Sequence, residues 1–88
     1  MEAARHLDGP PIGQNIRLAR RLAHDMTQGH LSRCSGIDQA ALSGYENGRH
    51  IPNWERLVEI ARCTGISDPG WFYTDHSDTW ASLKVDAE

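Results

Sequence analysis

Long hydrophobic runs are missing from this sequence. Among its 88 residues, no stretch of consecutive apolar side chains is longer than three, as at residues 40–42 and 71–73. A membrane-spanning helix needs about 20 such residues, and the core of a signal peptide needs about 7 to 15. We therefore expect a soluble, cytoplasmic protein that does not contact a membrane.

Cysteine is almost absent, with only Cys34 and Cys63. Small secreted domains that depend on disulfides have a framework of several cysteines, so we expect both thiols to be reduced. His30 and Cys34 lie four residues apart and, with Cys63, offer a partial zinc site. The three lack the short CxxC-type pair of structural zinc sites, so we expect no metal.

The sequence also lacks a glycine-rich loop for phosphates and a nucleophile, base and orienting group that would share a cleft. We therefore expect no enzymatic activity and no cofactor. A chain of 88 residues holds one small domain. At this size we expect no second domain that senses a small-molecule ligand.

Positive charge is scarce overall, because the formal net charge is −3. A negative protein is a poor partner for nucleic acid, but the charges are unevenly distributed. Residues 74–88 contain four acidic side chains against Lys84, whereas residues 12–52 contain five arginines against three acidic residues. A mildly basic body therefore precedes an acidic tail.

Apolar spacings of three and four residues predict helices over residues 12–24, 28–35, 39–47 and 54–63. Thr27 and Asp38 are suited to cap the second and third helices, and Gly36 ends the second. A short aromatic turn follows at residues 68–73. We divide the chain into a flexible N-terminal arm (1–11), a helical domain (12–73) and an acidic C-terminal tail (74–88) that is a candidate for dimerisation.

The helices 28–35 and 39–47 are separated by a short turn and are too short to be stable alone. The helices on either side must hold them, which presents 39–47 as an outer ridge of a shape that a DNA major groove accepts. The ordered pattern resembles the phage repressor and Cro type (XRE-like) of helix-turn-helix. Its matching residues are Ile12-Gly13, Ile16, Arg20, Thr27-Gln28, Leu31, Gly36-Ile37, Leu42-Ser43, Tyr45-Glu46-Asn47-Gly48, Pro52, Leu57 and Ile60-Ala61.

The resemblance implies a compact all-α, five-helix domain with a short polar tail, whose third helix reads operator DNA, usually as a homodimer. It places Gln28 on a phosphate and against Gln39, whose amide can pair with adenine. The base-reading face implied by the resemblance is Gln39, Ala40, Ser43 and Gly44. Three of these side chains are short or missing, so direct readout of bases should be thin and DNA shape should contribute.

Phosphate contacts are implied for the turn after the third helix, at Asn47, Arg49 and His50. Arg17 and Arg21 would add charge at the rim, and the alternative for all five is a solvated surface position. Arg20 and Glu46 match a family pair that bridges the first and third helices, which we interpret as structural. The alternative is that the two side chains never meet.

Aromatic side chains are concentrated near the end of the chain. Trp71, Phe72, Tyr73 and Trp80 are candidates for a two-fold interface that spaces two recognition helices by roughly 34 Å, about one DNA turn. The alternative is that they cover the open end of the core. From these features we expect a sequence-specific regulator of double-stranded DNA, a Cro-like or repressor-like protein of phage or bacterial origin. The rival is a protein-interaction module or antitoxin of the same fold with weak or lost DNA binding.

Overall fold

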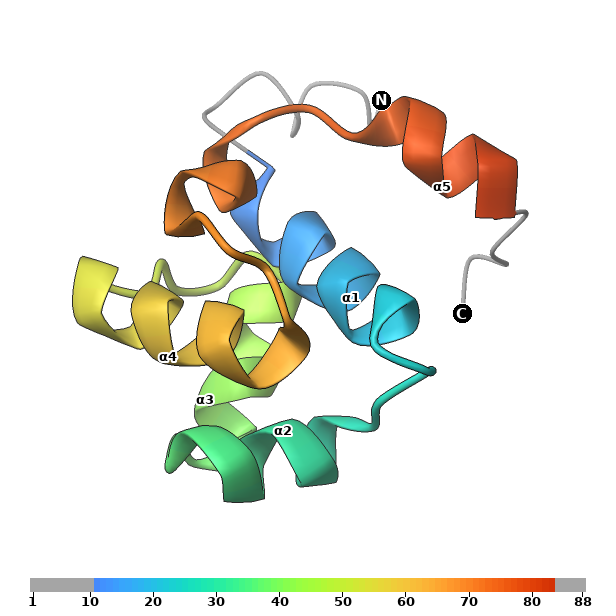
Figure 1. The fold of residues 1–88 in the computed structure, drawn as a ribbon. Helices are drawn as coiled ribbons and strands as arrows, with labels where there is room; N and C mark the ends of the chain where they lie inside the picture. Colours follow the sequence, from blue (N-terminus) through green and yellow to red (C-terminus); the bar gives the residue numbers. More distant parts are fainter. Residues whose placement is uncertain (1–10, 84–88) are drawn as a thin grey trace.

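The computed structural model describes residues 11–83, and all regular structure within them is helical (Figure 1). The expected all-α fold is thereby confirmed. The elements in chain order are α1 (Ile12–Leu22), α2 (Gln28–Ser35), α3 (Gln39–Glu46), α4 (Trp54–Thr64), the 3-10 helix η2 (Pro69–Tyr73) and α5 (Ser77–Leu83). Most of the expected N-terminal arm lies outside the described residues. Much of the expected polar tail is helical, as α5.

Phe72 of η2 is fully buried in the core. The same core contains Ile16 of α1 and Leu57 and Ile60 of α4, all with no exposed surface. Burial of one such side chain contributes about 1.5–3 kcal/mol. The core therefore holds α1, α4 and η2 together as the support for the two shorter helices.

Helices α2 and α3 begin and end at local signals in the sequence. Thr27 Oγ1 accepts a hydrogen bond from His30 N at 3.0 Å, and an Asp38 oxygen accepts one from Ala40 N at 3.0 Å. Gly36 ends α2 with a φ of 76°, a left-handed conformation that glycine adopts without a steric penalty. The predicted caps at Thr27 and Asp38 are confirmed.

Helix α1 ends two residues earlier than the sequence predicts, at Leu22. His24 and Asp25 follow with φ values of 61° and 56°, which are uncommon for residues other than glycine. The chain reverses here, and Arg20 holds the reversal because its Nη1 donates to Met26 O at 2.8 Å. The link between the first two helices is therefore a turn that contains two residues in the left-handed backbone conformation, and not a continuation of α1.

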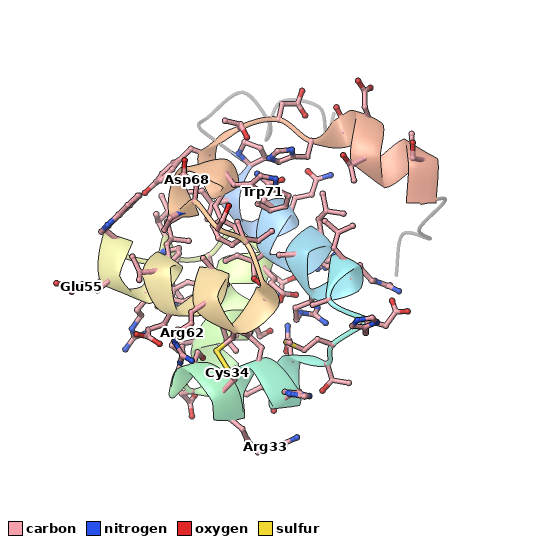
Figure 2. All side chains as sticks on the ribbon, viewed as in Figure 1. Arg33, Cys34, Glu55, Arg62, Asp68 and Trp71 are labelled. Atoms are coloured by element: carbon pink, nitrogen blue, oxygen red, sulfur yellow. A yellow bond between two sulfur atoms is a disulfide. The ribbon has the colours of Figure 1, made fainter. Side chains whose placement is uncertain are left out.

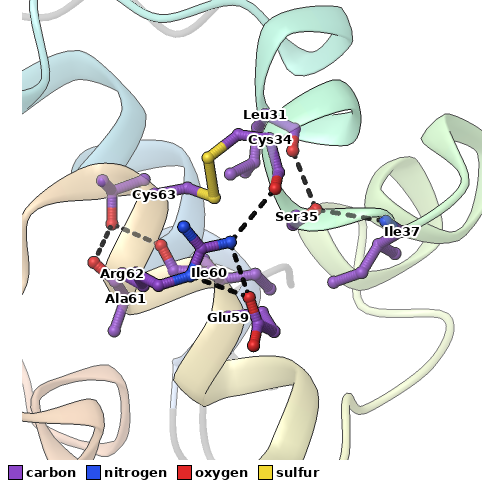
Figure 3. The surroundings of a disulfide bond; sticks show 10 residues. Leu31, Cys34, Ser35, Ile37, Glu59, Ile60, Ala61, Arg62 and Cys63 are labelled. Carbon is purple, nitrogen blue, oxygen red and sulfur yellow. Dashed lines mark hydrogen bonds and ion pairs between the residues drawn. A yellow bond between two sulfur atoms is a disulfide. The ribbon is translucent and has the colours of Figure 1, made fainter.

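Cys34 and Cys63 form a disulfide between the end of α2 and the end of α4 (Figure 3). The expectation of two reduced thiols was wrong. The two helices pack side by side and bring the Cα atoms to 6.0 Å, a separation that suits a disulfide. Within the described part of the chain, no group of three or more His, Cys, Asp or Glu side chains is placed to hold a metal ion.

Helix α5 lies at the opposite end of the molecule from α2 (Figure 1). Asp75 precedes it and accepts hydrogen bonds from Ser77 N and Oγ at 2.9 and 2.8 Å. These bonds lower the pKa of the Asp75 carboxyl below its ordinary value. Over residues 11–83, no helix is long and apolar enough to cross a membrane.

Candidate nucleic-acid interface

The turn between α2 and α3 is fixed by backbone and core contacts. Ser32 Oγ donates to Ile37 O at 2.6 Å, and Ile37 is buried in the core. Leu42 and Tyr45 of α3 are also buried. This arrangement aims the opposite face of α3 outward, where Gln39 and Ala40 are exposed.

Glu46, the last residue of α3, binds three other side chains. Arg20 Nε and Nη2 donate to its two oxygens at 2.8 and 2.7 Å, and Gln28 Nε2 donates to Oε1 at 3.1 Å. Arg17 Nε lies 3.6 Å from the same oxygen. The Glu46 side chain is only 1% exposed, so these charge-assisted bonds form away from water. They connect the end of α3 to α1 and to the start of α2.

Gln28 forms its side-chain hydrogen bond with Glu46, at the end of α3. Among the interactions of residues 11–83, its amide has no hydrogen bond to Gln39. Gln39 instead leans toward α2, with Oε1 3.7 Å from the position that a Cβ atom on Gly29 would occupy. Gln28 therefore helps to place the end of α3 rather than its beginning.

Gly44 is buried, so its expected place on the base-reading face is wrong. The His50 ring covers it, and a Cβ atom on Gly44 would lie 2.7 Å from His50 Cδ2. The loop folds back because Arg49 N and His50 N both donate to Gly44 O, at 2.8 and 3.3 Å. His50 thus occupies the surface position that helical spacing would assign to Gly44.

The remaining outer face of α3 is small and polar. Ser43 is half-buried and accepts a hydrogen bond from Asn47 Nδ2 at 3.3 Å. Asn47, Arg49 and His50 are exposed together in the loop that follows. The residues expected to contact phosphates in this loop are therefore accessible at one end of α3.

Arg33 of α2 is an exposed cation that the sequence analysis did not select. Its Nη1 lies 3.7 Å from the position of a Cβ atom on Gly29, the same distance as Gln39 Oε1. Figure 2 shows Arg33 extending away from the fold at the α2 end of the molecule. Within residues 11–83 its guanidinium has no hydrogen bond or ion pair. The signal in the sequence is the helical spacing of four residues between Gly29 and Arg33, which places a long side chain over a bare backbone position.

The arginines of α1 surround an open hollow of about 300 Å³ beside the start of α2. Arg17 is half-buried through its contact with Glu46, and Arg21 Nη1 lies 3.5 Å from Asp25 Oδ1. The N-terminus of a helix carries unpaired N–H groups and partial positive charge. The hollow is therefore polar and basic, although both rim arginines also interact with acidic side chains.

The four aromatic candidates for dimerisation have different environments. Phe72 is buried, and Trp71 is half-buried with its ring stacked on His76 at a centroid distance of 4.0 Å. Tyr73 is exposed and stacks on Trp54 at 6.3 Å. Nothing is described of the Trp80 side chain. Phe72 therefore belongs to the core, and the expectation that it lies in an interface was wrong.

An apolar surface was missed by the sequence analysis because its residues come from separate elements. Trp54, Val58 and Tyr73 are 52%, 38% and 41% exposed, and Trp54 joins the other two by helical spacing and by ring stacking. We call these three residues the Trp54 patch. Ile51, three residues before Trp54, is 76% exposed.

Comparison with protein families gives a match over residues 16–72, well over half of the chain, to the model of a helix-turn-helix domain. The match extends from within α1 to η2 and so includes both short helices and their supports. Comparison with curated proteins and with solved structures finds no match. The family consists of DNA-binding transcription regulators rather than enzymes. The chain therefore belongs to the helix-turn-helix family of the Cro and repressor (XRE) type.

Proposed function

We propose that this protein is a sequence-specific regulator that occupies an operator in double-stranded DNA, with α3 in the major groove. The observation that carries this proposal is the contact of Arg20, Gln28 and Arg17 with Glu46, which holds α3 in one orientation. A fixed helix that exposes Gln39 at its first turn can present an amide to a base edge. Ala40 offers contact with a thymine methyl group, and Ser43 a hydrogen bond to either partner.

Affinity comes mainly from phosphate contacts around α3. Arg33 on α2 and Asn47, Arg49 and His50 in the loop flank the reading face, and Gln28, Arg17 and Arg21 line its α1 side. Such contacts position a domain on the duplex without reading its sequence. Because Gly44 is covered and Ala40 is short, recognition depends partly on DNA shape.

The active form is a homodimer whose two α3 helices enter successive major-groove segments. The Trp54 patch supports this part of the proposal, since exposed stacked aromatic side chains are enriched in protein interfaces. Tyr73 is the member of this patch that the sequence also selects. Two-fold symmetry of the protein predicts an operator of inverted half-sites about 10 base pairs apart. We assign the protein to the cytoplasm, as a repressor or Cro-like regulator without an enzymatic role.

A protein-interaction module or antitoxin is the second candidate. The short reading face and the exposed Trp54 patch favour it, because together they offer more to a protein surface than to bases. In that case the same fold would bind a partner protein through Trp54 and Tyr73, and DNA binding would be weak or lost.

Selection of bound duplexes from a randomised DNA pool, at low and near-physiological salt, separates the two candidates. Enrichment of an inverted repeat at both salts supports the regulator, since purely electrostatic binding weakens steeply with salt. Gln39→Ala should then cost roughly 1–3 kcal/mol of discrimination at one base position without loss of fold. Failure to enrich any motif would reject the regulator and favour the protein partner.

A further inference from the structure

The Cys34–Cys63 disulfide encloses the recognition helix in a covalent loop. The two residues are 29 apart in sequence, and the segment between them contains all of α3. We propose that this bond is a thiol–disulfide exchange site, opened by a dithiol reductant, that controls how firmly α2 and α3 are held. The consequence for DNA affinity rests on the proposed function.

Besides the disulfide, hydrogen bonds from Gln28 to Glu46 and from Ser32 to Ile37 attach the two ends of α2 to its surroundings. Leu31 is the only fully buried residue of this eight-residue helix. Arg62 Nη2 of α4 donates to Cys34 O at 3.2 Å, but the Arg62 side chain is 59% exposed (Figure 3). A helix of this length is not stable by itself in water. The disulfide therefore adds a covalent restraint on the C-terminal half of α2, beside the Ser32–Ile37 hydrogen bond and the buried Ile37 that fix the turn to α3.

One of the two sulfur-bearing residues faces an open groove. Cys63 lines a groove of about 680 Å³ formed by the end of α1, the start of α2 and the end of α4, whereas Cys34 does not line it. His24, His30 and Arg62 line the same groove. Both cysteines are half-buried, and the groove brings solvent to the Cys63 residue, which we infer to be the side that a reductant approaches.

The exchange proceeds in two steps. A thiolate of the dithiol attacks Cys63 Sγ, a mixed disulfide forms, and Cys34 leaves as a thiolate that takes up a proton. The second thiol of the reductant then attacks the reductant sulfur that is bonded to Cys63. This step closes a disulfide within the reductant and releases the Cys63 thiol. Two electrons and two protons pass to the protein. The reverse exchange with an oxidised dithiol restores the bond.

The proposed location makes this bond responsive rather than permanent. Thiol systems keep the cytoplasm, where a DNA regulator of this kind acts, in a reducing state. Disulfides found there are usually transient and sense the redox state. A Cys34–Cys63 bond in a DNA-binding domain would therefore form and break with the redox state of the cell. The oxidised protein, with α2 and α3 held in place, is the form that binds DNA tightly.

The test compares the oxidised protein with the same protein reduced by dithiothreitol, both at 10 °C. The probe is the duplex that the oxidised protein enriches from a randomised pool. We expect reduction to lower affinity at least about tenfold, a common size for coupling between two sites. Far-UV circular dichroism should keep its helical signal, while amide hydrogen exchange should accelerate more in α2 and α3 than in α1 or α4, where only the lower global stability acts.

The control is the double variant Cys34→Ser, Cys63→Ser. It should bind DNA like the reduced protein and should not respond to dithiothreitol. Equal affinity of the oxidised and reduced proteins overturns the proposal. Global loss of helix on reduction also overturns it, because the bond would then be a condition of folding and not a local device.

A second readout is independent of DNA. Glutathione, a monothiol, should leave its mixed disulfide on Cys63, as located by peptide mass spectrometry, and a preference for Cys34 would contradict the proposed direction of attack. If the oxidised protein enriches no duplex but its α2 and α3 amides respond to reduction, the proposed function fails and the exchange site stands. If neither responds, both fail.

Discussion

Arg20 and Glu46 form a two-pronged ion pair that joins α1 to the end of α3. The donor–acceptor distances are 2.8 and 2.7 Å, and the two side chains are 14% and 1% exposed. Arg20 Nη1 also binds the carbonyl of Met26, so one guanidinium holds both the α1–α2 turn and the recognition helix. A planar guanidinium can make this set of bonds, whereas the single ammonium group of lysine cannot.

Arg20→Ala should lower the free energy of unfolding by about 3–5 kcal/mol, because it leaves a buried carboxylate without its main partner. Urea denaturation monitored by circular dichroism measures the change. Glu59→Ala is the matched control, since its partner Arg62 lies at the surface and the pair is 45% and 59% exposed. This control should cost less than about 1 kcal/mol. Equal losses in the two variants would mean that the buried pair has no special role.

Gly13 lies where the backbones of α1 and α3 approach each other closely. A Cβ atom there would collide with Tyr45 O and would lie 3.0 Å from Glu46 O, and these backbone atoms cannot rotate away. Gly13→Ala should therefore destabilise the protein by about 1–3 kcal/mol, although alanine is the better helix former. Thermal unfolding measures this difference.

The control for that variant is Gly29→Ala. The nearest atoms to a Cβ on Gly29 are the ends of the Arg33 and Gln39 side chains, both at 3.7 Å, which is an ordinary contact distance. Its stability should be unchanged or rise by up to about 1 kcal/mol. A Gly13→Ala protein as stable as the Gly29→Ala protein would refute the close approach of the two helices.

Local signals in the sequence predict the elements that carry this site. Thr27, Asp38 and Gly36 lie where the backbone needs a cap or a left-handed residue, so the bounds of α2 follow from neighbouring residues alone. Local signals could not predict the Arg20–Glu46 contact, because its two residues are 26 apart in the sequence. That contact was implied by the family resemblance alone.

Long-range packing determines what the sequence could not reveal. The disulfide depends on α2 and α4 lying side by side, and no local pattern at Cys34 or Cys63 indicates that arrangement. Gly44 is buried because the following loop returns and places His50 over it. Helical spacing alone puts Gly44 on the outer face, since spacing describes one helix and not the loop that folds across it.

Arg33→Ala tests whether α2 contributes to DNA binding. If Arg33 contacts a phosphate, its loss should reduce the slope of log affinity against log salt by about 0.9 and weaken all sequences alike. Stability should change by no more than about 0.5 kcal/mol, because the side chain is exposed. Arg62→Ala, which removes an exposed arginine from α4, should leave the salt slope unchanged. A salt slope unaffected by Arg33→Ala would remove Arg33 from the interface.

The disulfide also makes a prediction about stability that needs no DNA. Closing a loop of this length restricts the unfolded chain and stabilises the native state by about 3–4 kcal/mol in the chain-entropy account. Domains commonly have about 0.05–0.15 kcal/mol of stability per residue, so a chain of 88 residues can lose this amount and remain folded in the cold. The double variant Cys34→Ser, Cys63→Ser should therefore melt more than about 10 °C lower, with its helical signal at 10 °C retained. Reduction of the native protein should give the same melting temperature as the double variant, and a difference between the two would show that the serines, and not the missing bond, cause the loss.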